Sequence, residues 1–331
     1  MTEVLPGIHQ LKLPMTGSPL RWINGYLLKA DDGWVLVDCG WNLPDVIEAF
    51  QGYLAELAVD PQDVRTLVIT HYHPDHFGMS GTVVSLTRAR LLMHRLDWLF
   101  VDRDLRDFEG AVERMTAWLR ENGTPDDVID AEPHRADEMS RRFNFAQPDE
   151  LIEDGHRLKV GKHEFEFVWT PGHTGGHVCL YDRDRAVLLS GDHVLDPITP
   201  NVSLNRGGLG NPMGDYIASL RKVGQLEADL VLPAHGEPFR GLTRRIDELL
   251  AHHDERESEV MEALAGGSKT GAAVAAALPW TRRKRHFSEL ASSQQRMAIT
   301  ETLAHLEELV ARGRVSSGRC DGLIVYTAVS A

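Results

Sequence analysis

The sequence predicts an α/β protein in which one large domain is followed by a smaller helical domain. Its 331 residues are too many for one ordinary small domain, and 42% hydrophobic and 25% charged residues are usual for a globular chain. Up to about residue 240, short apolar runs alternate with stretches of helical spacing. Beyond that point the pattern changes to helices followed by a hairpin. We therefore expect domains at 1–242 and 243–331.

The first part of the chain contains strand patterns around one helical pattern. GYLLKA and WVLVDCG flank DDG, a turn signal that is typical of a hairpin. LPDVIEAFQGYLAEL then carries Val46, Ile47, Phe50 and Leu54 at helical spacing. VRTLVIT is a short β-rich run, and MSGTVVSLTR and ARLLMHR predict a further helix and strand.

A charged, loosely amphipathic stretch at about 96–150 predicts a helical insertion. Strand patterns resume with HRLKVGKHEFEFVWT, HVCLYD and AVLLSGD, and ADLVLPAHG predicts another strand. Between them, NPMGDYIASLRKVGQL predicts a helix that begins at Asn211-Pro212. After residue 242, three helical patterns and the hairpin RVSSGRCDGLIVY predict a winged-helix-like domain.

Charge and cysteine content exclude several classes of protein. The formal net charge of −14 repels nucleic acid and anionic membrane surfaces. No apolar run approaches the roughly 20 residues that a membrane-spanning helix needs, and the N-terminus has no signal-peptide pattern. Three widely spaced cysteines favour reduced thiols over disulfides. We expect a cytoplasmic protein that contacts no membrane. The charge weighs against a general nucleic-acid binder, although a local basic patch could override it.

The stretch THYHPDHFG at 70–78 concentrates ligand-type side chains after an apolar strand. In extended backbone, residues two apart point the same way, so His71 and His73 can converge on one cation. Pro74 holds His73 extended and redirects the chain. Asp75 and His76 then fall at a helix start, facing the same cavity. Imidazole and carboxylate groups in this array offer two ligands for one metal ion and two for a second, all from one turn.

Three later segments repeat the pattern of a ligand-type residue where an apolar run stops. TPGHTGGH places His173 in a glycine-rich loop, LLSGDH places Asp192 at a strand end, and LPAHGEP does the same for His235. Strand ends that meet at one edge of a sheet are where sites on such folds are built. These segments strengthen the prediction of a metal centre.

These motifs resemble those of the metallo-β-lactamase fold superfamily over residues 1 to about 240. The resemblance implies a four-layer αβ/βα sandwich with two divalent metal ions at one edge. Zinc is the favoured ion, with iron and manganese as alternatives. Carried across position by position, it implies that the first metal is held by His71, His73 and His173, the second by Asp75, His76 and His235, and that Asp192 bridges both.

The bridging carboxylate indicates which branch of the superfamily is closer. It is typical of hydrolases similar to glyoxalase II and to lactonases, whereas zinc β-lactamases lack it and are exported. The tail resembles the winged-helix domain that β-lactamase-like 2-type hydrolases carry. The resemblance therefore implies a cytoplasmic metallohydrolase in which a metal-bridging hydroxide attacks the carbonyl of a small acyl thioester, ester or lactone. Asp75 would orient that hydroxide, so Asp75 and Asp192 are the catalytic candidates.

Other functions remain open at this point. The same metals could serve a phosphodiesterase or ribonuclease, for which the basic run at 281–286 would be the binding patch. An iron-dependent dioxygenase is a further alternative. A DNA-binding regulator is disfavoured, because residues 246–331 hold 10 Lys+Arg and 12 Asp+Glu, a net charge of 10 − 12 = −2. The tail would instead serve dimerisation or substrate capping, so a homodimer is also open.

Some residues have weaker functional interpretations. His193, next to Asp192, is as consistent with packing or with support of a ligand as with substrate binding. Tyr72 points away from the flanking histidines and is expected in the core. Cys39 and Cys179 are expected to be small buried residues rather than nucleophiles.

Overall fold

The computed structural model describes residues 1–130, 143–204, 210–281 and 283–329. The chain divides into two compact units, each of which draws on three stretches of sequence. The predicted domain boundary at residue 242 stays a prediction. The first unit consists of Met1–Val101, Ala136–Pro200 and Ser219–Ile246, and the second of Asp102–Arg135, Asn201–Ala218 and Asp247–Ala331.

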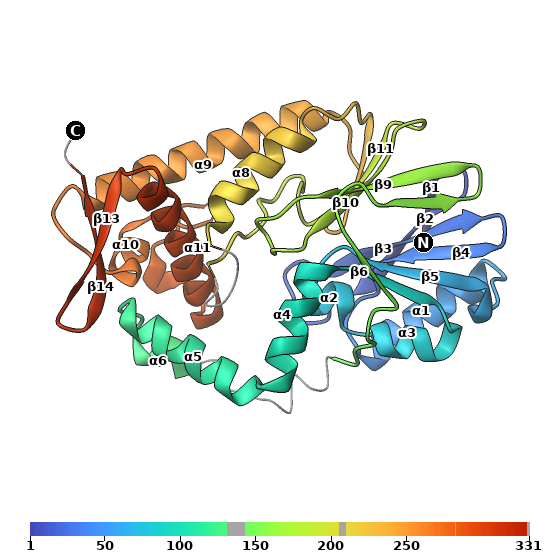
Figure 1. Ribbon diagram of the computed structural model, residues 1–331, viewed down its shortest axis with the longest axis horizontal. Coiled ribbons are helices and arrows are strands. Elements are labelled where there is room, and N and C mark those ends of the chain that lie inside the picture. Colours follow the sequence, from blue (N-terminus) through green and yellow to red (C-terminus); the bar gives the residue numbers. More distant parts are fainter. Residues whose placement is uncertain (131–142, 205–209, 282, 330–331) are drawn as a thin grey trace. The chain divides into compact units, whose positions relative to one another are not determined.

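Within the described ranges, the first sheet of the first unit has seven strands in chain order (Figure 1). Strands β1 to β4 run antiparallel, as the predicted hairpin requires, and β4 to β7 run parallel. Parallel neighbours place their carboxyl ends at one edge of the sheet. The strands are β1 (Thr2–Leu5), β2 (Ile8–Pro14), β3 (Trp22–Ala30), β4 (Gly33–Val37), β5 (Val64–Ile69), β6 (Arg90–His94) and β7 (Glu150–Ile152).

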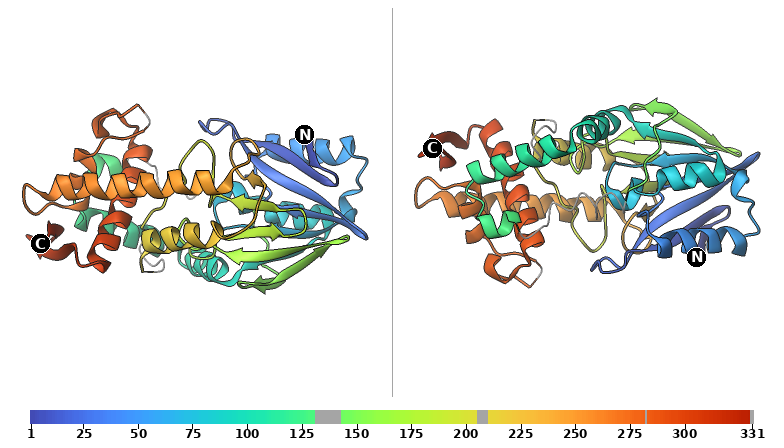
Figure 2. Two further views of the ribbon diagram at one scale, coloured as in Figure 1. Left: turned by 90° about the horizontal axis from the view of Figure 1, so that it is seen from above. Right: turned by 90° about the horizontal axis from the view of Figure 1, so that it is seen from below.

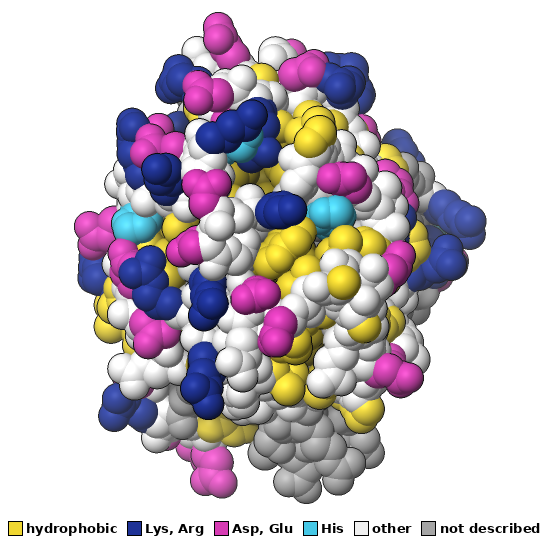
Figure 3. All heavy atoms as spheres, turned by 90° about the vertical axis from the view of Figure 1, so that its right-hand side faces the viewer, with side chains coloured by type: hydrophobic (Ala, Val, Ile, Leu, Met, Phe, Trp, Pro, Cys, Tyr) yellow, Lys and Arg dark blue, Asp and Glu magenta, His cyan; other side chains and the backbone are white. Residues whose placement is uncertain are grey.

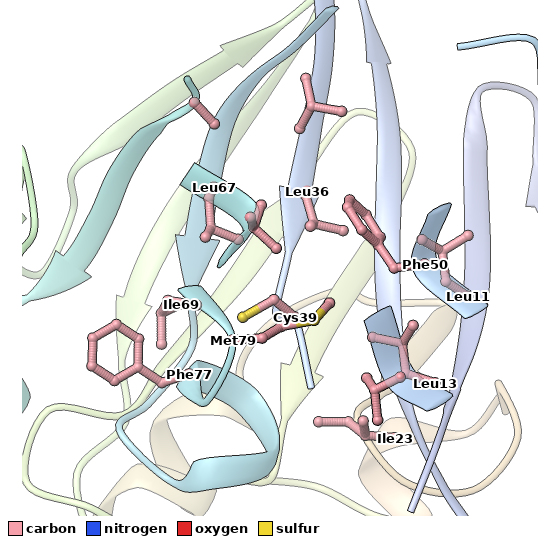
Figure 4. Close-up of a cluster of buried hydrophobic side chains, with 14 of the residues drawn as sticks. Leu11, Leu13, Ile23, Leu36, Cys39, Phe50, Leu67, Ile69, Phe77 and Met79 are labelled. Atoms are coloured by element: carbon pink, nitrogen blue, oxygen red, sulfur yellow. The ribbon is translucent and has the colours of Figure 1, made fainter. Parts of the chain in front are cut away.

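Helices connect the parallel strands and bury one face of this sheet. Helix α1 (Pro44–Glu56) joins β4 to β5, together with the short η1 (Pro61–Asp63). Helices α2 (Pro74–Phe77) and α3 (Ser80–Thr87) join β5 to β6. Figure 4 shows the apolar cluster that results, with side chains of the strands meeting those of the helices. Its labelled members are Leu11, Leu13, Ile23, Leu36, Cys39, Phe50, Leu67, Ile69, Phe77 and Met79.

A second sheet forms the other half of the first unit. It runs β12-β11-β10-β9-β8, antiparallel except for the parallel pair of β11 and β12. Apolar side chains of both sheets, such as Tyr26 and Phe167, share one buried cluster, so the sheets face each other. Figure 2 shows the two as separate layers. The strands are β8 (Arg157–Val160), β9 (His163–Trp169), β10 (Val178–Asp182), β11 (Val187–Gly191) and β12 (Leu230–Pro233).

The second unit is mainly helical, with a core of its own that includes Val260, Leu303 and Tyr326. The predicted hairpin is present, and among the described residues after 242 three α-helices and one short 3-10 helix precede it. Their assignment as a winged helix stays a prediction. Its elements are α5 (Phe108–Glu121), α6 (Asp126–Asp130), α10 (Gly271–Ala277), η2 (Phe287–Glu289), α11 (Ser292–Ala311), β13 (Val315–Cys320) and β14 (Leu323–Ala328), and α4 (Arg95–Arg106), α8 (Pro212–Val223) and α9 (Leu242–Leu264) contribute residues to both units.

The predicted helical insertion at about 96–150 is only partly helical. Helices α4 to α6 fill 95–130, apart from short turns, and 131–142 lie outside the described residues. Residues 143–145 were expected to be helical, which is wrong. Asn144 instead donates its backbone N–H to Gly78 and accepts from the N–H of Gly81, and these bonds hold the chain against α3.

The surface carries both signs of charge. Figure 3 shows basic and acidic side chains interspersed around hydrophobic ones on the face that it views. Despite the net charge of −14, this face is therefore not uniformly negative. Among the described helices, none combines the length and the apolar character that crossing a bilayer requires.

Candidate metal centre

The first ligand-type segment follows β5, as the sequence predicted. His73 is the N-cap of α2, with extended backbone at φ −60° and ψ 150°, and Pro74 is the first helical residue. The Nε2 atom of His71 lies 3.0 Å from Nδ1 of His73. The two imidazoles therefore converge, while Asp75 and His76 lie on the first turn of the helix.

His173 joins this pair from the loop between β9 and β10. Its Nε2 atom lies 3.2 Å from Nε2 of His71. The three ligand nitrogens of His71, His73 and His173 all lie within 4.8 Å of one another. We call these three residues the first ligand group.

Asp75, His76 and His235 form the second ligand group, and their ligand atoms also lie within 4.8 Å of one another. His235 follows β12, and its Nε2 atom lies 3.2 Å from Oδ2 of Asp75. The same Asp75 oxygen lies 3.8 Å from Nε2 of His76. All of these side chains except that of Asp75, which is 16% exposed, are almost fully buried.

Asp192 lies between the two groups. Its Oδ2 atom is 3.5 Å from Nε2 of His173, in the first group, and 3.7 Å from Nε2 of His76, in the second. Its Oδ1 atom is 3.6 Å from Nε2 of His235. The structure thus brings all seven sequence-predicted residues together, with one carboxylate reaching toward both groups.

A divalent cation fits the donor atoms of each group. Two ligands held about 2.1 Å from a tetrahedral ion lie roughly 3.4 Å apart. The distances from His71 to the other two members of the first group, and from Asp75 to the other two of the second, run from 3.0 to 3.8 Å. Nε2 of His76 and Oδ1 of Asp192 are buried, and neither has a hydrogen-bond partner among the described residues. Buried polar atoms without partners are costly, and a cation would satisfy both.

Two imidazoles of the first group, those of His71 and His73, are held neutral. Burial lowers the pKa of His71 well below its ordinary value, and the facing imidazoles of His76 and His73 lower it further. Burial also lowers the pKa of His73 to about 3, with a contribution from His173. Neutral imidazole is the form that binds a cation, so these side chains present lone pairs rather than protons.

The second group has the opposite balance because it contains carboxylates. Burial lowers the pKa of His76, but Asp38, Asp192 and Asp75 outweigh it and raise that pKa well above the ordinary value. Burial raises the pKa of Asp75, yet His76 and His235 bring it down to about 2. A cation that binds this group would replace the proton on His76, so binding would release protons.

Asp38 and Thr70 orient the imidazoles of two candidate ligands, His76 and His71. Asp38 follows β4, and its Oδ2 atom lies 2.8 Å from Nδ1 of His76. Thr70 donates its hydroxyl to the same carboxylate at 2.8 Å, and its Oγ1 lies 3.1 Å from Nδ1 of His71. Because both Nδ1 atoms face these partners, the Nε2 atoms of His71 and His76 are left to point at the centre.

His177 plays the same part for Asp192. Its Nε2 atom accepts the backbone N–H of Asp192 at 3.0 Å, and its Nδ1 lies 2.8 Å from Oγ1 of Thr170. Gly191, at φ +50°, permits this approach, since a Cβ there would lie 2.6 Å from Nε2 of His177. Sequence patterns did not single out Asp38, Thr70 or His177, although the segments that hold them were identified. Their position at strand ends beside predicted ligands was the available signal.

The residues with weaker interpretations are mostly buried. His193 is fully buried, and burial lowers its pKa to about 3. Tyr72 is half-buried against the apolar cluster of Figure 4 and contacts the ring of His73 edge-on. Cys39 and Cys179 are fully buried, as predicted. Burial raises the pKa of Cys179 to about 12, so that thiol is no nucleophile.

Two facing sheets that carry histidines and carboxylates at one edge are the arrangement of a metallohydrolase. A model of the metallo-beta-lactamase superfamily matches residues 22–235, well over half of the chain, and the chain therefore belongs to that superfamily. The sequence-based resemblance to this superfamily and its fold class are confirmed.

Relatives and solved structures agree with this assignment. The chain is 25% identical over 299 residues to a probable metallo-hydrolase, YqjP, of Bacillus subtilis, covering 88% of this chain and 89% of that one. It is 25% identical over 247 residues to a beta-lactamase-like protein 2 homolog of Caenorhabditis elegans, covering 74% and 66%. The crystal structure of a metallo-beta-lactamase family protein from Thermus thermophilus, TTHA1429, superposes with a TM-score of 0.85 at 31% identity, covering 99% of this chain and 100% of that one.

Proposed function

We propose that this protein is a dinuclear metal-dependent hydrolase that cleaves a small acyl thioester, ester or lactone. The observation that carries the proposal is the position of Asp192, whose two oxygens lie 3.5 to 3.7 Å from imidazole nitrogens of both ligand groups. Two divalent cations, with zinc favoured, would when bound activate water as a nucleophile at neutral pH and polarise a carbonyl oxygen. Each group supplies three ligand atoms besides Asp192.

Asp75 is the residue proposed to orient the attacking water. Its side chain is 16% exposed, more than that of any other member of the second group, so it can meet water that enters the centre. The charges of His76 and His235 keep it ionised by holding its pKa at about 2, against the effect of burial. An ionised carboxylate accepts hydrogen bonds only, so it can orient an attacking water.

The leaving group is inferred from the charge partners of the two catalytic carboxylates. Among the described residues, no lysine or arginine pairs with Asp75 or Asp192; their partners at this range are histidines. A departing amine needs a proton donor, whereas a thiolate leaves without one, since thiol pKa values are about 8.5. We therefore favour thioesters over amides, and keep lactones as candidates in which water protonates the departing alkoxide.

The test combines metal content with a substrate panel. The purified chain would be analysed for bound metal and assayed on acyl-coenzyme A and glutathione thioesters, lactones, p-nitrophenyl esters and bis-p-nitrophenyl phosphate. Two metals per chain with turnover of carbonyl substrates is the expected result. Turnover of the phosphodiester alone would make the enzyme a phosphodiesterase, and one iron without hydrolysis would overturn the proposal.

Asp192→Asn provides the matched loss of function, with Asp182→Asn as its control. Asp182 is a buried carboxylate whose ion-pair partners, Arg185 and His163, belong to neither ligand group. Asp192→Asn should lose at least two orders of magnitude in kcat together with bound metal, and Asp182→Asn should retain both.

A cytoplasmic location is also proposed. The three cysteines are free thiols, of which Cys39 and Cys179 are buried and Cys320 is exposed. Free thiols persist in reducing compartments. Export of the protein by the cells that make it, shown by fractionation, would contradict this proposal.

A further inference from the structure

Asp97 is a buried carboxylate beside the metal centre that has no part in the proposed function. Asp97 lies in the first turn of α4 and is only 1% exposed to solvent. Its Oδ2 atom accepts the backbone N–H of Tyr72 at 2.9 Å and the hydroxyl of Thr174 at 2.8 Å. Its Oδ1 atom accepts the backbone N–H of Gly176 at 2.5 Å.

The three donors belong to the two segments that supply the first ligand group. Tyr72 stands between His71 and His73, and Thr174 directly follows His173. One side chain therefore fastens both segments at points next to the ligands. The Nε2 atoms of His71 and His173 lie 3.2 Å apart across this junction.

The backbone around Asp97 is shaped for this contact. A Cβ at position 176 would lie 2.6 Å from the backbone N of Asp97 and 2.7 Å from its Oδ1. Only glycine therefore lets the loop come this close. Burying an ionisable carboxylate costs several kcal/mol unless hydrogen bonds compensate, so a side chain that only filled space would be apolar.

We propose that Asp97 is a positioning residue that fixes the distance between the His71–His73 pair and His173, and thereby the affinity of the first ligand group for its cation. The inference rests on the proposed function only in taking this group to be a metal site. It predicts that loss of the Asp97 hydrogen bonds weakens the first group selectively, since Asp97 makes none of the contacts described for Asp75, His76 and His235.

Asp97→Asn is the first test, because its amide keeps the size of the carboxylate but turns one acceptor into a donor that faces N–H and O–H groups. The metal-free protein would be titrated with Co²⁺ and Zn²⁺ in competition with a chelator, and the d–d absorption of Co²⁺ recorded. We expect 10- to 100-fold weaker binding of one of two ions and a changed absorption for that ion alone. Asp182→Asn is the control for loss of a buried carboxylate.

Thr174→Val is a milder variant that removes one donor without changing side-chain shape, and it serves if Asp97→Asn does not fold. It should weaken the binding of the same ion by a smaller factor. In the double variant the two effects should not add, because both substitutions remove the same hydrogen bond between Thr174 and Asp97. One contrary result is that the wild-type protein binds two ions while folded Asp97→Asn and Thr174→Val bind them with the same affinity and the same Co²⁺ absorption as the wild type. That result would overturn this inference but leave the proposed function standing. A wild-type chain that binds no ion would overturn the proposed function and this inference with it.

Discussion

The Nδ1 atom of His76 lies 2.8 Å from the Oδ2 atom of Asp38, and both side chains are buried. The same carboxylate also accepts the backbone N–H and the hydroxyl of Thr70. This arrangement leaves Nε2 of His76 without a hydrogen-bond partner among the described residues, 3.7 Å from Asp192. The orientation of a proposed metal ligand is thus fixed by a residue 38 positions earlier in the chain.

Asp38→Asn should therefore weaken metal binding at the second ligand group. An amide nitrogen in place of Oδ2 would donate to Nδ1 of His76, which moves the imidazole proton to Nε2 and blocks that ligand atom. The expected loss is 10- to 100-fold in affinity for one of two ions, measured by chelator competition. Asp182→Asn should bind as the wild type does. Unchanged affinity in Asp38→Asn would show that His76 is not a ligand.

Removal of metal should lower the thermal stability of the chain. A ligand that binds only the folded state stabilises it by about 2.7 kcal/mol when present at 100 times its dissociation constant. Differential scanning calorimetry should therefore give a higher Tm for the protein with added Zn²⁺ than for the protein with chelator. In Asp192→Asn most of this difference should vanish, because Asp192 contacts both groups. Equal Tm values for the wild type would contradict the metal site.

Gly191→Ala should destabilise the protein more than Gly161→Ala. Both glycines have positive φ, +50° and +60°, where an alanine costs about 1–2 kcal/mol. An added Cβ at 161 would meet its nearest neighbour at 3.4 Å, but at 191 it would lie 2.6 Å from Nε2 of His177. The difference in urea unfolding free energy therefore measures the overlap with His177. Equal losses would mean that His177 moves aside at no cost.

Acid should weaken the second unit through the histidine pair of α9 and α11. Nδ1 of His253 lies 3.4 Å from Nε2 of His305, and both are buried. Burial, with smaller effects of His252 and Arg256, lowers the pKa of His253 to about 3. Burial also lowers the pKa of His305 well below its ordinary value.

The sign of the pH effect follows from these lowered values. The unfolded chain titrates these imidazoles near pH 6.5, so below that pH it binds more protons than the folded chain. The free energy of unfolding should fall between about pH 6.5 and pH 3, by up to about 1.4 kcal/mol per pH unit for each group. His253→Gln should reduce this slope in urea unfolding, and His286→Gln, at an exposed position, should not. If His253→Gln leaves the slope unchanged, the buried His253 is not a source of the pH dependence of stability.

The sequence alone predicted the ligand-type residues because they are local signals. His71 and His73 were identified by their spacing. His173, Asp192 and His235 were identified because each follows an apolar run. The partners behind them could not be predicted this way. Asp38 meets His76, and Asp97 meets Gly176, only because tertiary packing brings distant segments together. Composition and periodicity do not indicate which distant residues will pair.

The limits of sequence patterns also explain the error in the insertion. Residues 143–145 continue an amphipathic, charged stretch that favours a helix when taken by itself. In the structure Asn144 exchanges backbone hydrogen bonds with Gly78 and Gly81 next to α3. Non-local hydrogen bonding overrides local preference there, as is common where a chain returns to a sheet.

The wide spread of the ligand residues along the chain affects how the centre acquires its ions in the cell. His71, His73 and His76 leave the ribosome long before His235, and at 5–20 residues per second the delay is roughly ten to thirty seconds. At the start of that interval the nascent chain offers three imidazoles; His173 then completes the ligands of the first group, and His235 completes those of the second group last. Selection of an ion by the finished geometry can begin only after translation has passed β12.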